Sequence, residues 1–150
     1  MRRYYKTEDE IRALVESFEA CSFHPSEFRH YQHLTVALWY VRKLPFEDAT
    51  EKVTRGIRRL AETYGKTGYH ETITLFWLRV VSCFVADREN LTLPELANAL
   101  IEHCVDKNLI GRHYSANLLA SSRAKAEWVE PDLASLPEIT EHRVVTGGAT

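Results

Sequence analysis

The segment GYHETITLFWLRVVSCFVAD, residues 68–87, is the stretch of the chain that decides the fold. Its apolar side chains recur every three or four residues, which is the period of one face of an α-helix. That face consists of Ile73, Trp77, Val80, Val81 and Phe84. Thr67 stands where it can cap the start of this helix. Because no other segment has so strong an apolar stripe, we expect this helix to be the central one.

Segments on both sides also combine helical period with helix boundary signals. Thr7 and Glu10 form a capping box at the start of one helix. Pro45 suits the first turn of another, which Gly65 ends. The main helices are expected at residues 8–20, 26–43, 45–65, 68–87 and 92–108, and two short ones after Ser115 and after Ser121 or Ser122.

The fold class follows from these segments. The Asn-Gly and Asp-Gly pairs typical of β-hairpin turns are absent from the sequence. The sequence therefore predicts an all-α fold, an antiparallel bundle of about five main helices with short C-terminal helices and an extended tail. We expect one domain over residues 1–150, with the core bundle at residues 8–130 and a surface tail at residues 131–150.

Composition and charge exclude some classes of partner. Hydrophobic residues make up 45% of the chain and charged residues 27%, which is typical of globular domains. The formal net charge of −2 offers no broad cationic surface for nucleic acid. Arg79 interrupts the longest apolar stretch, residues 73–86, so we expect no membrane span. No secretory signal is recognisable, and the three cysteines are widely spaced, so a cytoplasmic location is expected.

The histidines gather at one end of the predicted bundle. The second and fourth helices of an up-and-down bundle run parallel, so their starts lie at the same end, together with the end of the fifth. Six of the seven histidines fall there: His24, His30, His33, His70, His103 and His113, with His142 left in the tail. At about 100° per residue, His30, His33 and His70 point inward, and Glu71 lies near the edge of the same face.

This arrangement predicts a metal site. Two imidazoles with one carboxylate match the ligand set of non-haem iron, and suit zinc, manganese or nickel equally. The positive end of a helix dipole keeps His33 and His70 neutral, as metal ligands must be. We therefore expect His33, His70 and Glu71 to hold a divalent metal. Glu71 is also the candidate general base, and His30 the candidate second catalytic residue or third ligand.

A small metal-dependent enzyme acting on a small organic substrate is the leading hypothesis. Tyr40, Trp77 and Phe84 would line its substrate pocket, and His113 would lie at the lid. One alternative is a non-catalytic protein that encloses a small molecule through histidine hydrogen bonds. Another is a structural or interaction protein whose buried histidines tie the helix starts together.

Four stretches of the sequence carry a resemblance. They are HYQHL at residues 30–34, YHETIT at 69–74, Tyr114-Ser115 with Leu118-Leu119 and Ser121, and WVEPDL at 128–133. Together they resemble a family of small all-helical bacterial proteins that has no known activity, over about residues 18–137. Its members often carry an aspartate where this chain has Gln32. The resemblance implies that His33, His70 and Glu71 belong to family motifs.

Overall fold

The computed structural model describes residues 3–66, 68–106 and 108–136. These residues form seven α-helices and two 3₁₀ turns, and they contain no strand, which confirms the all-α prediction. The helices are α1 (Glu8–Glu19), α2 (His30–Lys43), α3 (Phe46–Thr63), α4 (Glu71–Ala86), α5 (Leu93–His103), α6 (Ala116–Leu119) and α7 (Ser122–Ala126), and the 3₁₀ turns are η1 (Pro25–Glu27) and η2 (Leu109–Arg112). Among the described residues, no helix has the length and apolar composition needed to cross a bilayer.

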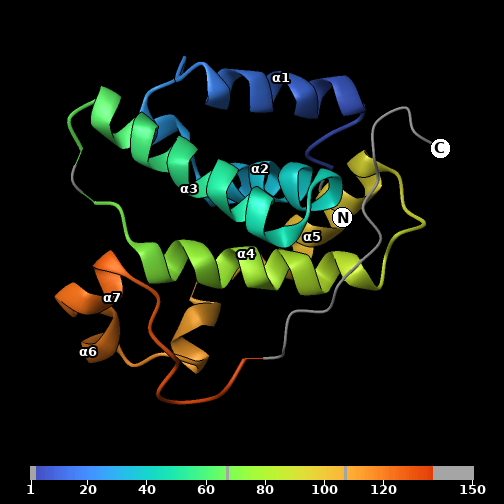
Figure 1. Cartoon of the computed structure of the whole chain (residues 1–150). Coiled ribbons are helices and arrows are strands. Elements are labelled where there is room, and N and C mark those ends of the chain that lie inside the picture. The colour runs from blue at the N-terminus through green and yellow to red at the C-terminus, as the bar shows by residue number, and fades with distance from the viewer. Residues whose placement is uncertain (1–2, 67, 107, 137–150) are drawn as a thin grey trace.

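The bundle is built around α2. This helix packs against α1, α3, α4 and α5, as Figure 1 shows. Five consecutive residues from Leu34 to Leu38 are buried, so α2 is covered on all sides. α2 thus takes the central place that the apolar stripe predicted for α4. The reason is that α4 borders the bundle on one side and the C-terminal segment on the other.

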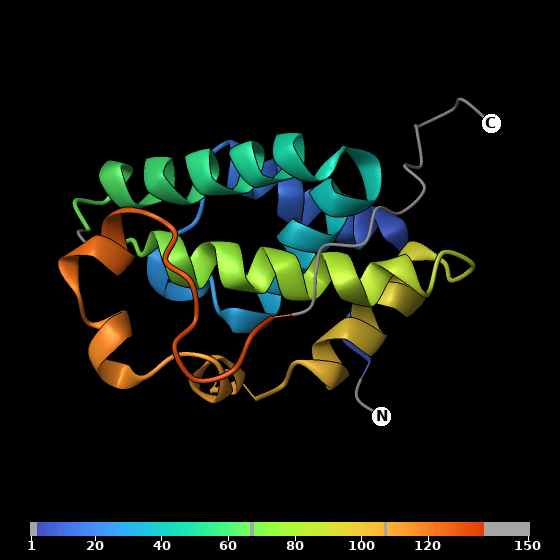
Figure 2. The same ribbon diagram turned by 60° about the horizontal axis from the view of Figure 1, so that its bottom comes forward.

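The C-terminal segment covers the outer side of α4. In Figures 1 and 2, α6 and α7 lie across α4 from α1. A second apolar cluster forms here around Phe76, Tyr114 and Val129. The hydroxyl of Tyr114 donates to the Val129 carbonyl over 2.7 Å, which fixes the chain after α7. Leu133, further along this segment, is 59% exposed.

Most predicted caps are present. The Thr7–Glu10 capping box forms, and Ser115 and Ser121 cap α6 and α7. Gly65 has a φ of 66° just beyond α3, the left-handed conformation that ends helices. Pro45 is the N-cap of α3 rather than a first-turn residue. Thr67, the expected cap of α4, lies outside the described residues, as does His142.

Two helix starts differ from prediction, and both carry histidines. The second helix begins at His30 rather than near Ser26, because Pro25–Glu27 forms a separate turn and Phe28 leaves helical geometry at φ −95° and ψ 81°. The fourth begins at Glu71, so His70 is its N-cap, in extended conformation. His70 therefore does not lie on a helix face.

Candidate functional site

A cavity of about 330 Å³ lies between α2, α3 and α4. Its walls are mainly aliphatic and aromatic, and their polar groups are two imidazoles, one hydroxyl and the indole N–H of Trp77. The lining residues are Phe28, His30, His33, Leu34, Ala37, Val53, Ile57, Ile73, Thr74, Trp77 and Leu78. No carboxylate, lysine or arginine of the described chain is among them.

A second cavity of about 170 Å³ adjoins the first. The two share Phe28, His33 and Ile57 as lining residues. Lys66 and Tyr69, from the connection between α3 and α4, line the second cavity only. His33 therefore stands at the junction of the two spaces.

His33 is a neutral imidazole. Its ring packs against Phe28 at 3.9 Å between centroids. Burial lowers the pKa of His33 from 6.5 to about 4, the neighbouring His30 lowers it further, and a hydrogen bond with the Phe28 backbone opposes both. The neutral form was expected, but burial rather than the helix dipole is the main cause. Because the Phe28 carbonyl only accepts, one ring nitrogen carries the proton and the other is an acceptor.

His30 lies on the same cavity and holds two helices together. Its Nε2 is 3.0 Å from the carbonyl oxygen of Cys104, at the end of α5, so Nε2 carries a proton and donates it. Its ring contacts Trp77 edge-on, with centroids 4.6 Å apart. In this arrangement Nε2 is not available as a metal ligand.

His70 uses both ring nitrogens in structural hydrogen bonds. Nδ1 accepts from the Ile73 amide over 3.2 Å, which caps α4. Nε2 donates to the carbonyl of Leu119 over 2.7 Å, which ties α6 to the start of α4. No nitrogen of this ring is left for a metal in the folded arrangement.

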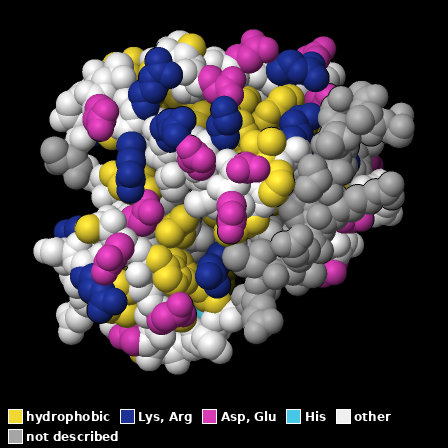
Figure 3. Space-filling view, in the orientation of Figure 1, with side chains coloured by type: hydrophobic (Ala, Val, Ile, Leu, Met, Phe, Trp, Pro, Cys, Tyr) yellow, Lys and Arg dark blue, Asp and Glu magenta, His cyan; other side chains and the backbone are white. Residues whose placement is uncertain are grey.

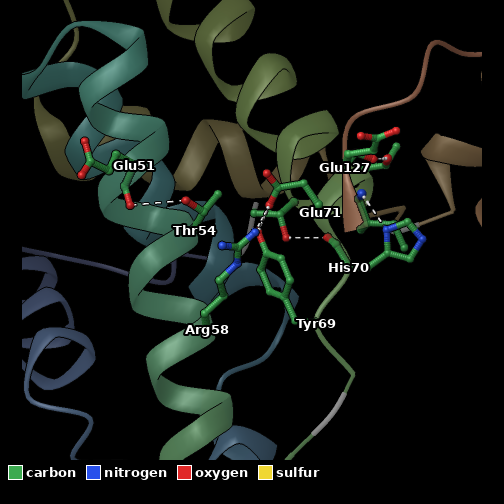
Figure 4. A network of polar contacts seen from close by, with 10 residues as sticks. Glu51, Thr54, Arg58, Tyr69, His70, Glu71 and Glu127 are labelled. Carbon is green, nitrogen blue, oxygen red and sulfur yellow. Dashed lines mark hydrogen bonds and ion pairs between the residues drawn. The ribbon is translucent and has the colours of Figure 1, made fainter. Parts of the chain in front are cut away.

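Glu71 faces α3 rather than the histidines. Its Oε1 accepts from Arg58 over 3.1 Å and from the Tyr69 hydroxyl, and its side chain is 20% exposed. The Arg58 guanidinium also lies 4.8 Å from the centre of the Tyr69 ring. Burial, together with this hydrogen bond to Glu71, raises the pKa of Tyr69. Figure 4 shows Glu71 turned toward Arg58 and Tyr69 while the His70 ring turns toward the C-terminal segment.

Of the four expected pocket residues, only Trp77 lines the cavity. Tyr40 donates to Glu19 of α1 over 2.5 Å. Phe84 packs on His103, 5.0 Å between ring centroids, and His113 Nδ1 lies 2.9 Å from the Ala134 carbonyl oxygen. These three residues serve other contacts of the bundle.

The expected gathering of histidines is not a ligand set. Among the described residues, no group of three or more His, Cys, Asp or Glu side chains could hold a metal ion. The physical reason lies in the two shifted helix starts, which send His70 toward α6 and leave His30 and His33 together on the cavity. We therefore assign no chemistry to a metal here, and its presence stays a prediction.

Several cavity residues were not predicted from the sequence. Phe28 lies between η1 and α2, where no periodicity marks its direction. Ala37 of α2 and Val53 of α3 are small, and their size leaves space beside the Trp77 indole. These two small residues indicate a cavity only when α2 and α3 are already known to pack against each other.

Trp77 connects the cavity with the outer side of α4. It lines the cavity and is half-buried against both apolar clusters, the main core and the cluster around Phe76. Its ring meets that of Phe76 at 5.1 Å and 83°. Trp77 thus contacts both the cavity and the apolar cluster that holds the C-terminal segment.

Comparison with known proteins gives no homologue from which a role could be transferred. No family model, no curated protein and no solved structure matches the chain significantly.

Proposed function

We propose that the protein binds a small, mainly apolar molecule in the cavity between α2, α3 and α4. Protein interiors are close-packed, with few voids larger than a water molecule. Ligand pockets start at about 300 Å³, and an apolar cavity of about 150 Å³ is enough to take up benzene. A space of about 330 Å³ with mainly apolar walls suits a ligand of that kind.

The observation that carries the proposal is the position of His33. A polar ring in an apolar wall costs free energy, about 1–3 kcal/mol for each polar atom left without a partner. The His33 ring is half-buried in this wall, its pKa is lowered mainly by burial, and its neutral form has one nitrogen that can accept a hydrogen bond. A bound molecule that covers this nitrogen would avoid the cost by donating a hydrogen bond to it.

The proposal corresponds to a binding protein rather than to the metal-dependent enzyme. The enzyme hypothesis needs His33, His70 and Glu71 around one ion. Reaching that state would break the His70 cap of α4 and the Glu71–Arg58 ion pair. The cavity requires no such rearrangement, which favours binding without a metal.

Filling the cavity tests the proposal. Ala37 lines the cavity and Ala13 is exposed on α1, so Ala37→Leu and Ala13→Leu form a matched pair. With 2-naphthol as the probe, calorimetry should show binding to the wild type and to Ala13→Leu, and clearly weaker binding to Ala37→Leu. Methyl NMR shifts should change at Leu34, Val53 and Ile57. Equal affinity in all three proteins, or no binding by the wild type, would overturn the proposal.

A further inference from the structure

The cavity selects against charged molecules. None of its lining residues among those described carries a carboxylate, ammonium or guanidinium group, and His33 is neutral. An ion that enters loses its hydration and meets no opposite charge. The surface, by contrast, mixes both signs, and Figure 3 shows basic and acidic side chains interspersed over one face. Among the described residues that line the two cavities, the one charged side chain is that of Lys66, which lines the second cavity only.

Two of the four polar side chains that line the cavity, His30 and Thr74, already donate a hydrogen bond to the protein. His30 donates to the Cys104 carbonyl, and His33, whose pKa is lowered by burial, is neutral and keeps one unprotonated ring nitrogen. The Thr74 hydroxyl donates to the His70 carbonyl over 2.9 Å. What His33 can offer a ligand is therefore a lone pair, on its unprotonated nitrogen.

We infer that the ligand is a neutral, mainly apolar molecule with a hydrogen-bond donor, such as a phenol, an indole or an alcohol, and that its donor binds the free ring nitrogen of His33. This inference rests on the proposed function, since it names the class of molecule that the same cavity takes. His33 borders both cavities, so the donor lies at their junction. The apolar body of the ligand lies deeper, beside Ala37 and Trp77.

A series of naphthalene probes tests the inference by calorimetry at pH 7. 2-Naphthol has a donor, 2-methoxynaphthalene has an acceptor only, and naphthalene has neither. We expect 2-naphthol to bind about three- to tenfold more tightly than the other two, the effect of one net hydrogen bond. Naphthoate and naphthylmethylammonium, the charged analogues, should bind more weakly than 2-naphthol.

Variants of His33 distinguish the contribution of its hydrogen bond to ligand affinity from the contribution of the shape of its ring. His33→Phe keeps a ring but has no acceptor, so the preference for 2-naphthol should vanish while naphthalene still binds. His33→Gln keeps an acceptor and should retain part of the preference. His103→Phe, the same substitution at an exposed position of α5, should behave as the wild type. Circular dichroism and thermal unfolding establish that each variant is folded.

The outcomes distinguish this inference from the proposed function. Equal binding of the three neutral probes, or a preference that survives in His33→Phe, would overturn the donor assignment and leave small-molecule binding standing. Tighter binding of either charged analogue would overturn the neutral class. Failure of every probe to bind the wild type would overturn both.

Discussion

Nε2 of His70 lies 2.7 Å from the carbonyl oxygen of Leu119, so the residue that caps α4 also anchors α6. The same ring accepts the Ile73 amide through Nδ1. One imidazole therefore joins two elements that are 49 residues apart in the chain. The sequence predicts His70 to be an inward-pointing metal ligand. In the folded chain its ring instead joins α4 to α6 through two hydrogen bonds.

Replacing His70 should lower stability. His70→Ala removes both hydrogen bonds and should reduce the free energy of unfolding by about 1–3 kcal/mol. His70→Asn keeps an acceptor for the Ile73 amide and should recover part of that loss. Urea denaturation measures the difference, with Lys52→Ala at an exposed position of α3 as the control. Wild-type stability in His70→Ala would contradict the structural role.

Gly56 should not tolerate a methyl group. A Cβ at this position of α3 would overlap the ring of Phe18, which is 1% exposed and has little room to move. Overpacking of this kind costs about 1–3 kcal/mol, more than the gain of about 1 kcal/mol from alanine's helix propensity. Thermal unfolding should therefore show a lower Tm for Gly56→Ala. Gly111→Ala meets open space and should change the Tm little; a similar drop in both would refute the packing argument.

His33 should make stability depend on pH. Its pKa is about 4 in the fold against an ordinary value of 6.5, so between these values the unfolded chain binds the proton more readily. The contribution of His33 to the free energy of unfolding is therefore fully present above about pH 6.5. It decreases as the pH falls toward 4, by about 1–3 kcal/mol in all. Urea denaturation from pH 7.5 to 4.5 should show a steeper loss for the wild type than for His33→Gln.

The comparison with His33→Gln isolates the histidine. Glu10, Glu95 and Asp132 also have pKa values that are lowered, each mainly by hydrogen bonds, and they reduce stability at more acidic pH. These groups are the same in both proteins, so their effect cancels in the difference. Parallel curves for the two proteins would show that His33 titrates at its ordinary pKa.

Metal content separates the two functional hypotheses. Protein purified without a histidine tag and then offered iron, zinc, manganese or nickel should hold no stoichiometric ion if the cavity works as a binding site alone. Elemental analysis gives the content. One ion per chain, lost in both His33→Gln and His70→Gln, would contradict this expectation and support the metal-dependent enzyme.

Local sequence signals predicted the elements of this fold well. Helical period and caps located all five main helices, because both act within a few residues along the chain. The capping box at Thr7 and the left-handed Gly65 are examples. Their success explains why the all-α class could be predicted without any knowledge of packing.

The candidate site was harder to predict because it depends on helix starts and on packing. A shift of a few residues at the start of α4 turned His70 from a core-facing residue into a cap. The helix starts here because the His70 imidazole accepts a hydrogen bond from the Ile73 amide. The apolar periodicity of the sequence gives no information about such a cap. The cavity depends on the volumes of Ala37, Val53 and Ile57 on neighbouring helices, which no single segment reveals.

The double contact of Trp77 predicts that the cavity and the C-terminal segment are thermodynamically linked. Any molecule that changes the free energy of the Trp77 side chain also changes how firmly the chain around Phe76 and Tyr114 is docked on α4. Linkage is reciprocal, so a ligand bound in the cavity would change the free energy of docking by the same coupling energy by which docking changes ligand affinity. Amide hydrogen exchange along residues 116–129 would then report cavity occupancy from outside the cavity.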